Sequence, residues 1–232
     1  MKVIRADRMA GPLHPALAAA IADPEAVPLD LLRLQLIADS AIGRNNHPVF
    51  LPDFITADPG AWVVEVMPAV QIGRLGKFIR PKFAARHISA ILLAGWVRPA
   101  TADSATPITL LFDGALTRGV EMPLNEIFPA DSFPADSADS CDVTSGKAPL
   151  QIEAEYSPIR DASGENTKRE SASMAREQIH AEDMVAFVSR FCTLKSGDII
   201  IPASAGITFP VALDMRLRAT LNGINALELR LK

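Results

Sequence analysis

The chain has 232 residues and a mass of 24.9 kDa, which is enough for one large domain or two small ones with a sizeable core. Its 23 Lys and Arg residues against 27 Asp and Glu residues leave a net charge of −4, so we expect no nucleic-acid partner. The two cysteines, Cys141 and Cys192, exclude a disulfide scaffold and a structural zinc site.

The N-terminus and the apolar segments bear on the expected compartment. Charges fall within the first eight residues and no apolar stretch of signal-peptide length follows, so the sequence predicts a cytoplasmic protein. The most apolar windows, around residues 88–97 and 199–211, are about ten residues long, whereas a membrane span needs about twenty. We therefore expect neither a transmembrane helix nor a membrane partner.

The first 47 residues have a mixed pattern. Residues 2–5 predict a short strand, residues 14–23 a helix, and the leucines at 29–36 a strand, although a helical stripe fits them nearly as well. We expect residues 1–47 to form a small segment that packs on the main domain, residues 48–232, which is a single structural unit.

The clearest strand lies at residues 62–72, where the side chains alternate. This alternation places one set toward the core, namely Trp62, Val64, Val66, Val70 and Ile72. Glu65 and Met67 then share the opposite face. Pro68 has no backbone N–H to donate, which indicates an edge strand or a bulge.

The next segments alternate between local order and polar loops. Pro81 and the apolar spacing that follows it predict a short amphipathic helix over residues 81–91. Residues 129–149 are rich in Asp, Ser and Pro and predict a solvated loop, and residues 157–176 predict a long hairpin.

The C-terminal part gives the clearest secondary-structure predictions. Acids in the first turn and an apolar stripe predict a helix over residues 181–191, with Phe187 and Phe191 buried on one face. A strand follows Asp198, and alternating residues on both sides of Asn222-Gly223 predict a β-hairpin. Together these elements predict a β-dominated α/β protein.

Four motifs stand in a characteristic order. They are HPVFLPDF from His47, EVMPAVQIGRLGKFI from Glu65, FDGALTRG from Phe112 and VSRFCTLKSGDIII from Val188. In this order they resemble the fumarylacetoacetate hydrolase family, in particular its C-terminal catalytic domain, and the chain looks like a divergent member. The last motif is the most specific of the four. The resemblance implies a mixed β-sheet roll or sandwich with a few short helices, and a homodimer.

Members of this family typically hold Mg²⁺ or Ca²⁺ and hydrolyse, decarboxylate or isomerise oxo acids. The resemblance places the equivalent pocket at Glu65, Met67, Trp96, Leu110 and Asp113. Glu65 matches the first carboxylate of an E-x-E pair, but Met67 replaces the second, and a thioether is a poor ligand for a hard cation. The family's third carboxylate ligand falls at or next to the position of Trp96, and Leu110 occupies the position where the family usually has a lysine. We therefore expect no metal site, no catalytic residues and no cofactor.

Two further positions remain open. Asp113 is retained from the family's F-D-G motif, in which Gly114 is explained by turn geometry. His14 is the nearest counterpart of the catalytic histidine in the family's N-terminal loop, but the Asn-Tyr pair that precedes this histidine in the family is absent here. Whether His14 belongs to the site is left open.

Two hypotheses about function follow. The first is a family scaffold with a degenerate metal site, inactive or binding a small carboxylic or oxo acid in an altered role. The second is an active relative in which Asp103 or Asp113 replaces a lost ligand, so that it hydrolyses or decarboxylates a β-dicarbonyl or oxo acid. Apolar side chains at three formerly polar positions favour the first. Whether the protein is an enzyme is open at this point.

Overall fold

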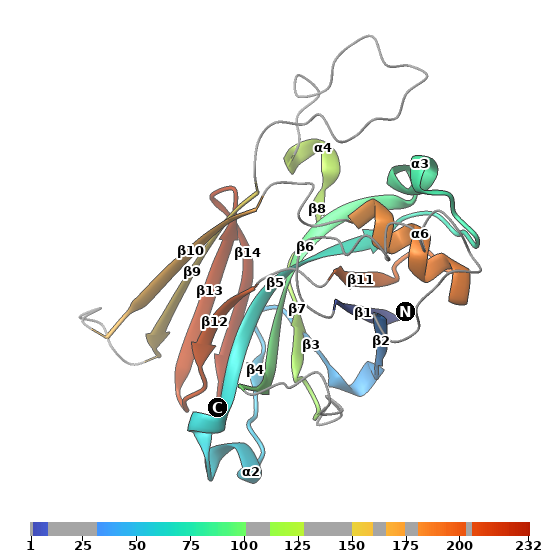
Figure 1. The fold of residues 1–232 in the computed structure, drawn as a ribbon. Helices are drawn as coiled ribbons and strands as arrows, with labels where there is room; N and C mark the ends of the chain where they lie inside the picture. Colours follow the sequence, from blue (N-terminus) through green and yellow to red (C-terminus); the bar gives the residue numbers. More distant parts are fainter. Residues whose placement is uncertain are drawn as a thin grey trace.

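The computed structural model describes residues 2–8, 32–100, 112–127, 150–159, 166–174, 181–202 and 206–232. Two β-sheets dominate this part of the chain, and a few short helices accompany them (Figure 1). The predicted β-dominated fold, with mixed curled sheets, is confirmed. None of the described helices combines the length and the apolar character needed to cross a bilayer.

The larger sheet has nine strands, of which seven follow the order β2-β1-β11-β5-β6-β7-β3, while β12 pairs with β5 and β8 pairs with β6. Their bounds are β1 (Val3–Arg8), β2 (Leu32–Ile37), β3 (Ile42–Arg44), β5 (Trp62–Ile72), β6 (Ile88–Pro99), β7 (Leu116–Arg118), β8 (Met122–Pro123), β11 (Ile199–Pro202) and β12 (Ile207–Pro210). β1 pairs with β11 and β3 with β7 in parallel, and the remaining pairs are antiparallel.

The smaller sheet has five strands in the order β10-β9-β13-β14-β4 and stands beside the larger one in Figure 1. Its strands are β4 (Pro48–Val49), β9 (Leu150–Pro158), β10 (Lys168–Met174), β13 (Met215–Leu221) and β14 (Ile224–Leu231). The helices are α2 (Asp53–Thr56), α3 (Pro81–Ala84), α4 (Leu124–Ile127) and α6 (Ala181–Phe191), with short 3-10 turns at Asp39–Ala41, Pro59–Ala61 and Ala85–His87.

The two faces of β5 pack against different cores, as its alternation predicts. The main core lies between the sheets and under α6, and it includes all five residues expected to face it: Trp62, Val64, Val66, Val70 and Ile72. Met67 belongs to a second apolar cluster on the opposite face, to which Glu65 also points by the period of the strand. This second face carries the candidate site.

Pro68 is neither at an edge nor in an irregular stretch of the β5–β6 pairing. It lies opposite Leu93 in the centre of the larger sheet. On its other edge, β5 pairs with β12 through residues 63–66 and with β11 through residues 70–71. Proline therefore lies in the gap between two partner strands, where a missing N–H need not interrupt a ladder.

The helix predicted over residues 81–91 is wrong in extent. α3 ends at Ala84, a 3-10 turn ends at His87, and Ile88 already begins β6. The apolar residues of β6 are buried on both faces, so they have no alternation to reveal a strand. Pairing with β5 along almost its whole length outweighs the local helical spacing.

Other predicted elements are confirmed. β9 and β10 form the expected antiparallel hairpin, and β13 and β14 join at Asn222-Gly223, which have φ of 50° and 78°. α6 spans the predicted residues, but only Phe187 is buried on it, whereas Phe191 is 50% exposed. Phe191 is the last residue of the helix and lies beyond its buried face, and the two rings stay in contact at 5.1 Å.

Two predictions fall on residues outside the described ranges, namely the helix at 14–23 and the polar loop at 129–149. Within residues 1–47, β1 lies between β2 and β11, and β3 pairs with β7. These strands therefore contribute to the same sheet as β5.

Candidate functional site

Glu65 is the central residue of the candidate site. It is only 6% exposed, and the register of the sheet places it opposite Trp96 on β6 and Thr208 on β12. Gly206 lies against it so closely that a Cβ there would come within 2.7 Å of the Glu65 Cγ. The position needs glycine because a larger residue would displace the carboxylate or the adjoining backbone.

Two arginines neutralise this buried carboxylate. The Nε of Arg98, two residues after Trp96 on β6, lies 2.5 Å from Oε2 of Glu65. Nη1 of Arg5, on β1, lies 4.0 Å from the same oxygen. Both guanidinium side chains are largely buried, with exposed fractions of 15% and 13%. A charge-assisted hydrogen bond in such a site is stronger than one at the surface.

Trp96 completes the cluster. Its side chain is buried, and the guanidinium of Arg5 lies over its ring at 4.2 Å from the centroid, a cation–π geometry. The indole Nε1 is buried without a hydrogen-bond partner among the described residues. An unpaired buried donor is unfavourable, so this atom can readily bind an acceptor that enters the site.

Met67 and its apolar neighbours on this face form a buried cluster. The apolar cluster around it contains Val3, Ile37, Ala41, Ala69, Leu92, Ala94, Trp96, Ala115, Leu116, Ile199 and Ile201. Met67 pairs directly with Ala94, two residues from Trp96. The sequence-predicted neighbours Glu65, Met67 and Trp96 are therefore brought together by the β5–β6 pairing.

These residues do not fit a divalent cation of the Mg²⁺ or Ca²⁺ type. Such ions need several oxygen ligands at one point, but the neighbours of Glu65 offer a thioether, an indole and two cationic guanidinium groups. The described residues contain no cluster of three or more His, Cys, Asp or Glu side chains able to hold a metal. One of the two oxygens of Glu65, Oε2, is already bonded to Arg98.

Of the remaining predicted pocket residues, the structure describes only Asp113. Asp113 is exposed in a turn that precedes β7, and Gly114 beside it has a φ of 80°, as the turn interpretation requires. Leu110, His14 and Asp103 lie outside the described residues.

Asp198, from the T-L-x-x-G-D motif, has a structural role. Its Oδ1 accepts a hydrogen bond from the backbone N–H of Lys2 and its Oδ2 one from the N–H of Lys195, both at 2.8 Å, and the Lys2 ammonium lies 2.8 Å from Oδ2. Burial alone would raise the pKa of this carboxyl, but the bonds from Lys2 and Lys195 outweigh it and hold the pKa below its usual value. Asp198 therefore fastens β1 to the start of β11.

Ser189, from the same motif, holds the loop after β5. Its Oγ accepts a hydrogen bond from the N–H of Ile79 at 2.9 Å and donates one to the carbonyl of Ala186 at 2.7 Å. Its own carbonyl accepts one from the N–H of Phe78 at 3.0 Å. The most specific motif of the sequence thus stabilises the scaffold rather than the Glu65 cluster.

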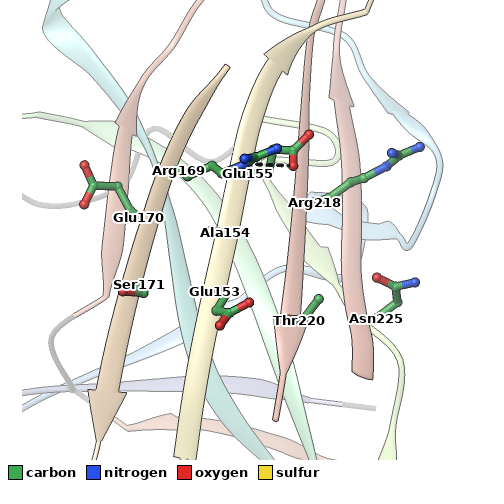
Figure 2. Close-up of a pocket in the computed structure, with 9 residues that line it drawn as sticks. All are labelled: Glu153, Ala154, Glu155, Arg169, Glu170, Ser171, Arg218, Thr220 and Asn225. Atoms are coloured by element: carbon green, nitrogen blue, oxygen red, sulfur yellow. Dashed lines mark hydrogen bonds and ion pairs between the residues drawn. The ribbon is translucent and has the colours of Figure 1, made fainter. Parts of the chain in front are cut away.

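A separate depression of about 430 Å³ lies on the smaller sheet (Figure 2). Its lining consists of Glu153, Ala154, Glu155, Arg169, Glu170, Ser171, Arg218, Thr220 and Asn225. Arg169 and Glu155 form an ion pair across it at 3.4 Å, and Figure 2 shows Glu170 turned away from the others. It is open, mixed in charge and built on β9, β10, β13 and β14, so it shares no residue with the Glu65 cluster.

Sequence reasoning missed Arg98 and Arg5. Arg98 could have been found by stepping two residues from Trp96 along a strand, had residues 88–99 been recognised as one. Arg5 has no local signal, because only the parallel pairing of β1 with β11 brings residue 5 near β5.

No family profile matches the sequence, and no curated protein matches it. Several solved structures, in contrast, resemble the structure of this chain. The fumarylpyruvate hydrolase from Pseudomonas aeruginosa, determined with Mn²⁺ and pyruvate, is 17% identical with a TM-score of 0.62, over 100% of this chain and 89% of its own. A candidate fumarylacetoacetate hydrolase family protein from Yersinia pestis CO92 is 18% identical with a TM-score of 0.65. The match covers 100% of this chain and 93% of the Yersinia protein.

The 5-carboxymethyl-2-hydroxymuconate delta-isomerase from Mycobacterium smegmatis is also similar, at 18% identity and a TM-score of 0.63, over 99% of this chain and 78% of its own. These neighbours define a class of β-dominated hydrolases and isomerases, and the chain shares their architecture along its whole length. It has the fold of the fumarylacetoacetate hydrolase family. At such low identity the likeness establishes the fold.

Proposed function

We propose that this chain is a divergent member of the fumarylacetoacetate hydrolase family that has lost the divalent cation and the associated hydrolase or isomerase activity. The observation that carries the proposal is the 2.5 Å contact between Arg98 and Glu65. Arg98 and Arg5 supply the positive charge beside this carboxylate that a metal ion would otherwise supply.

Metal binding would be costly at this position. A cation that took Oε2 of Glu65 as a ligand would have to displace Arg98 and leave its buried guanidinium without its carboxylate. Separating a buried ion pair costs about 3–5 kcal/mol. The incoming ion would gain only one protein carboxylate, because Met67 and Trp96 stand at the other two positions.

The competing proposal, an active enzyme with a rearranged ligand set, has less support. Of its two replacement ligands, Asp113 is exposed in the turn before β7. Asp103 lies outside the described residues. The active alternative is therefore kept as an outcome of the experiment below.

A small carboxylic or oxo acid is the ligand class that the cluster favours. Two guanidinium groups lie beside the carboxylate, and the Trp96 Nε1 adds a hydrogen-bond donor. An acid of this kind would be bound without turnover, because the described side chains near Glu65 do not suit a metal ion that could activate a water.

The test combines thermal unfolding with activity assays. Mg²⁺, Ca²⁺ or Mn²⁺ should cause no saturable rise in melting temperature, because a ligand that prefers the folded state must raise it. Acylpyruvate hydrolysis and oxaloacetate decarboxylation should stay at background, with the Pseudomonas aeruginosa fumarylpyruvate hydrolase as the positive control. Pyruvate or oxaloacetate without metal should raise the melting temperature in the wild type but not in Arg98→Met.

Metal-dependent turnover by the unmodified protein, abolished by Glu65→Ala, would overturn the proposal and establish the rearranged enzyme. The reverse experiment is Met67→Glu with Trp96→Asp, which restores both carboxylates. Loss of the Trp96 side chain removes buried volume and costs about 3–5 kcal/mol. The folded state of that variant must therefore be checked before its metal affinity is interpreted.

A further inference from the structure

The loop after β5 and the short helix that follows it present an unusual surface. We call it the loop surface and define it by four apolar side chains, Leu75, Phe78, Phe83 and Phe191, with the bases Arg74, Lys77, Arg80, Lys82 and Arg86. Figure 1 shows α3 and the adjoining segment at one edge of the molecule, beside α6 and away from the smaller sheet. Glu65 lies near the other end of β5, so this surface is separate from the candidate site.

The apolar side chains of the loop surface are exposed although the backbone beneath them is fixed. Leu75 is 65% exposed and Phe78 is 67% exposed. Between them, Gly76 pairs with Leu194 through two backbone hydrogen bonds, of 3.0 and 2.8 Å. The N–H of Phe78 and the N–H of Ile79 both bond to Ser189. The loop therefore holds its apolar tips outward in a defined conformation.

Phe78 also adopts a backbone conformation that disfavours its side chain. Its φ is 54°, in the left-handed region that bulky residues rarely occupy. Asn or Gly would satisfy the same turn with less strain. A strained, exposed aromatic residue in a well-anchored loop points to a role for the side chain outside the fold.

The charge of the loop surface is opposite to that of the chain. Residues 74–87 contain five Lys and Arg and no Asp or Glu, whereas the whole protein carries −4. All five bases are exposed. The helix that packs against α3, α6, carries two acids in its first turn, Glu182 and Asp183, and the five bases outnumber them. A partner for this surface must therefore be anionic and must accept apolar side chains.

A second copy of the chain and a nucleic acid fit these features poorly. A symmetric dimer through this surface would bring its bases against themselves. Stacking of nucleobases needs free aromatic faces, but Lys77 lies over the ring of Phe78 at 5.0 Å, and Lys82 and Arg86 lie over that of Phe83 at 4.9 and 5.3 Å. An aliphatic Leu75 offers no stacking at all.

An anionic lipid bilayer fits better than an acidic protein. Protein interfaces are depleted in lysine and bury their anchors in pockets, whereas here lysines surround apolar side chains that project from a loop. Bases attract anionic headgroups, and Phe and Leu side chains at the same depth enter the boundary with the acyl chains. We propose that the loop surface binds peripherally to anionic membranes, which departs from the sequence-based expectation of no membrane partner.

The test is co-sedimentation of the full-length protein with phosphatidylcholine vesicles, with or without about a third of phosphatidylglycerol. Binding should need the anionic lipid and disappear in about 1 M salt, where the Debye length is about 3 Å. Lys77→Gln with Lys82→Gln should weaken it about 20- to 30-fold, because each base contributes about fivefold. Phe78→Asn, which suits the left-handed backbone, should weaken it about tenfold.

Matched controls lie on other surfaces. Phe50→Asn removes a phenylalanine that is 70% exposed elsewhere, and Lys168→Gln removes an exposed base on β10. Both should bind like the wild type, and all variants should keep a cooperative thermal transition. Equal binding to both vesicle types, no binding at all, an equal effect of the controls, or preferential binding of an oligodeoxythymidylate would overturn the proposal.

Discussion

Removal of Arg98 provides the sharpest test of the Glu65 cluster. Arg98→Met keeps an apolar stem but leaves Glu65, whose side chain is 8% exposed, without its closest partner. Loss of one member of a buried pair costs about 3–5 kcal/mol, and Arg5 at 4.0 Å compensates in part, so we expect about 3 kcal/mol. In a chain of this size the melting temperature should fall by about 6–12 °C.

The second half of the cycle is Glu65→Gln. In the Arg98→Met background it should restore most of the lost stability, because no unpaired buried charge remains. Urea unfolding of the four proteins gives the coupling energy, which we expect to be about 2 kcal/mol. Arg169→Met, whose pair with Glu155 is exposed, is the matched control and should cost less than about 1 kcal/mol. A cost below about 1 kcal/mol for Arg98→Met, or no rescue, would refute this reasoning.

Asp198 has a lowered pKa, so its contribution to stability is complete above the ordinary Asp pKa and is lost as pH falls toward the pKa of the folded state. Asp198→Asn should cost about 2 kcal/mol at neutral pH and should make the unfolding free energy depend less on pH in the acid range. Burial raises the pKa of Tyr156 to about 12, against a bond from the N–H of Ala212. This is the only tyrosine, so ultraviolet titration should show no phenolate near pH 10 while the protein is folded, and stability should fall as pH rises from 10 to 12. Light scattering should give about twice 24.9 kDa if the expected homodimer forms, and a single-chain mass would contradict it.

What could be predicted from the sequence depended on one-sided burial. The two faces of β5 pack in two different cores, and the strands of the hairpin at Asn222-Gly223 have one face on the core and one toward solvent. The alternation of their side chains could therefore be recognised in the sequence. β6 is buried on both faces, and its first residues resembled a helix. Only the three-dimensional pairing with β5 distinguishes the two.

The site was predictable to a similar degree. The alignment of motifs located Glu65, Met67 and Trp96, which the β5–β6 register brings together. It could not supply Arg5, the second cation beside Glu65, because Arg5 is 60 residues away in sequence and lies on β1. Long-range charge pairs of this kind leave no periodic signal.

The neighbouring positions of β1 and β11 also constrain how the protein is made. Val3 pairs with Ile199, and β11 is the strand that joins β1 to β5. A ribosome must therefore synthesise nearly two hundred residues before β11 can complete the larger sheet between β1 and β5. Until then, the edge of β5 that pairs with β11 has no partner there. Contacts of such high sequence separation slow folding and expose strands to aggregation. The nascent chain should accordingly depend on chaperones more strongly than its modest size alone would suggest.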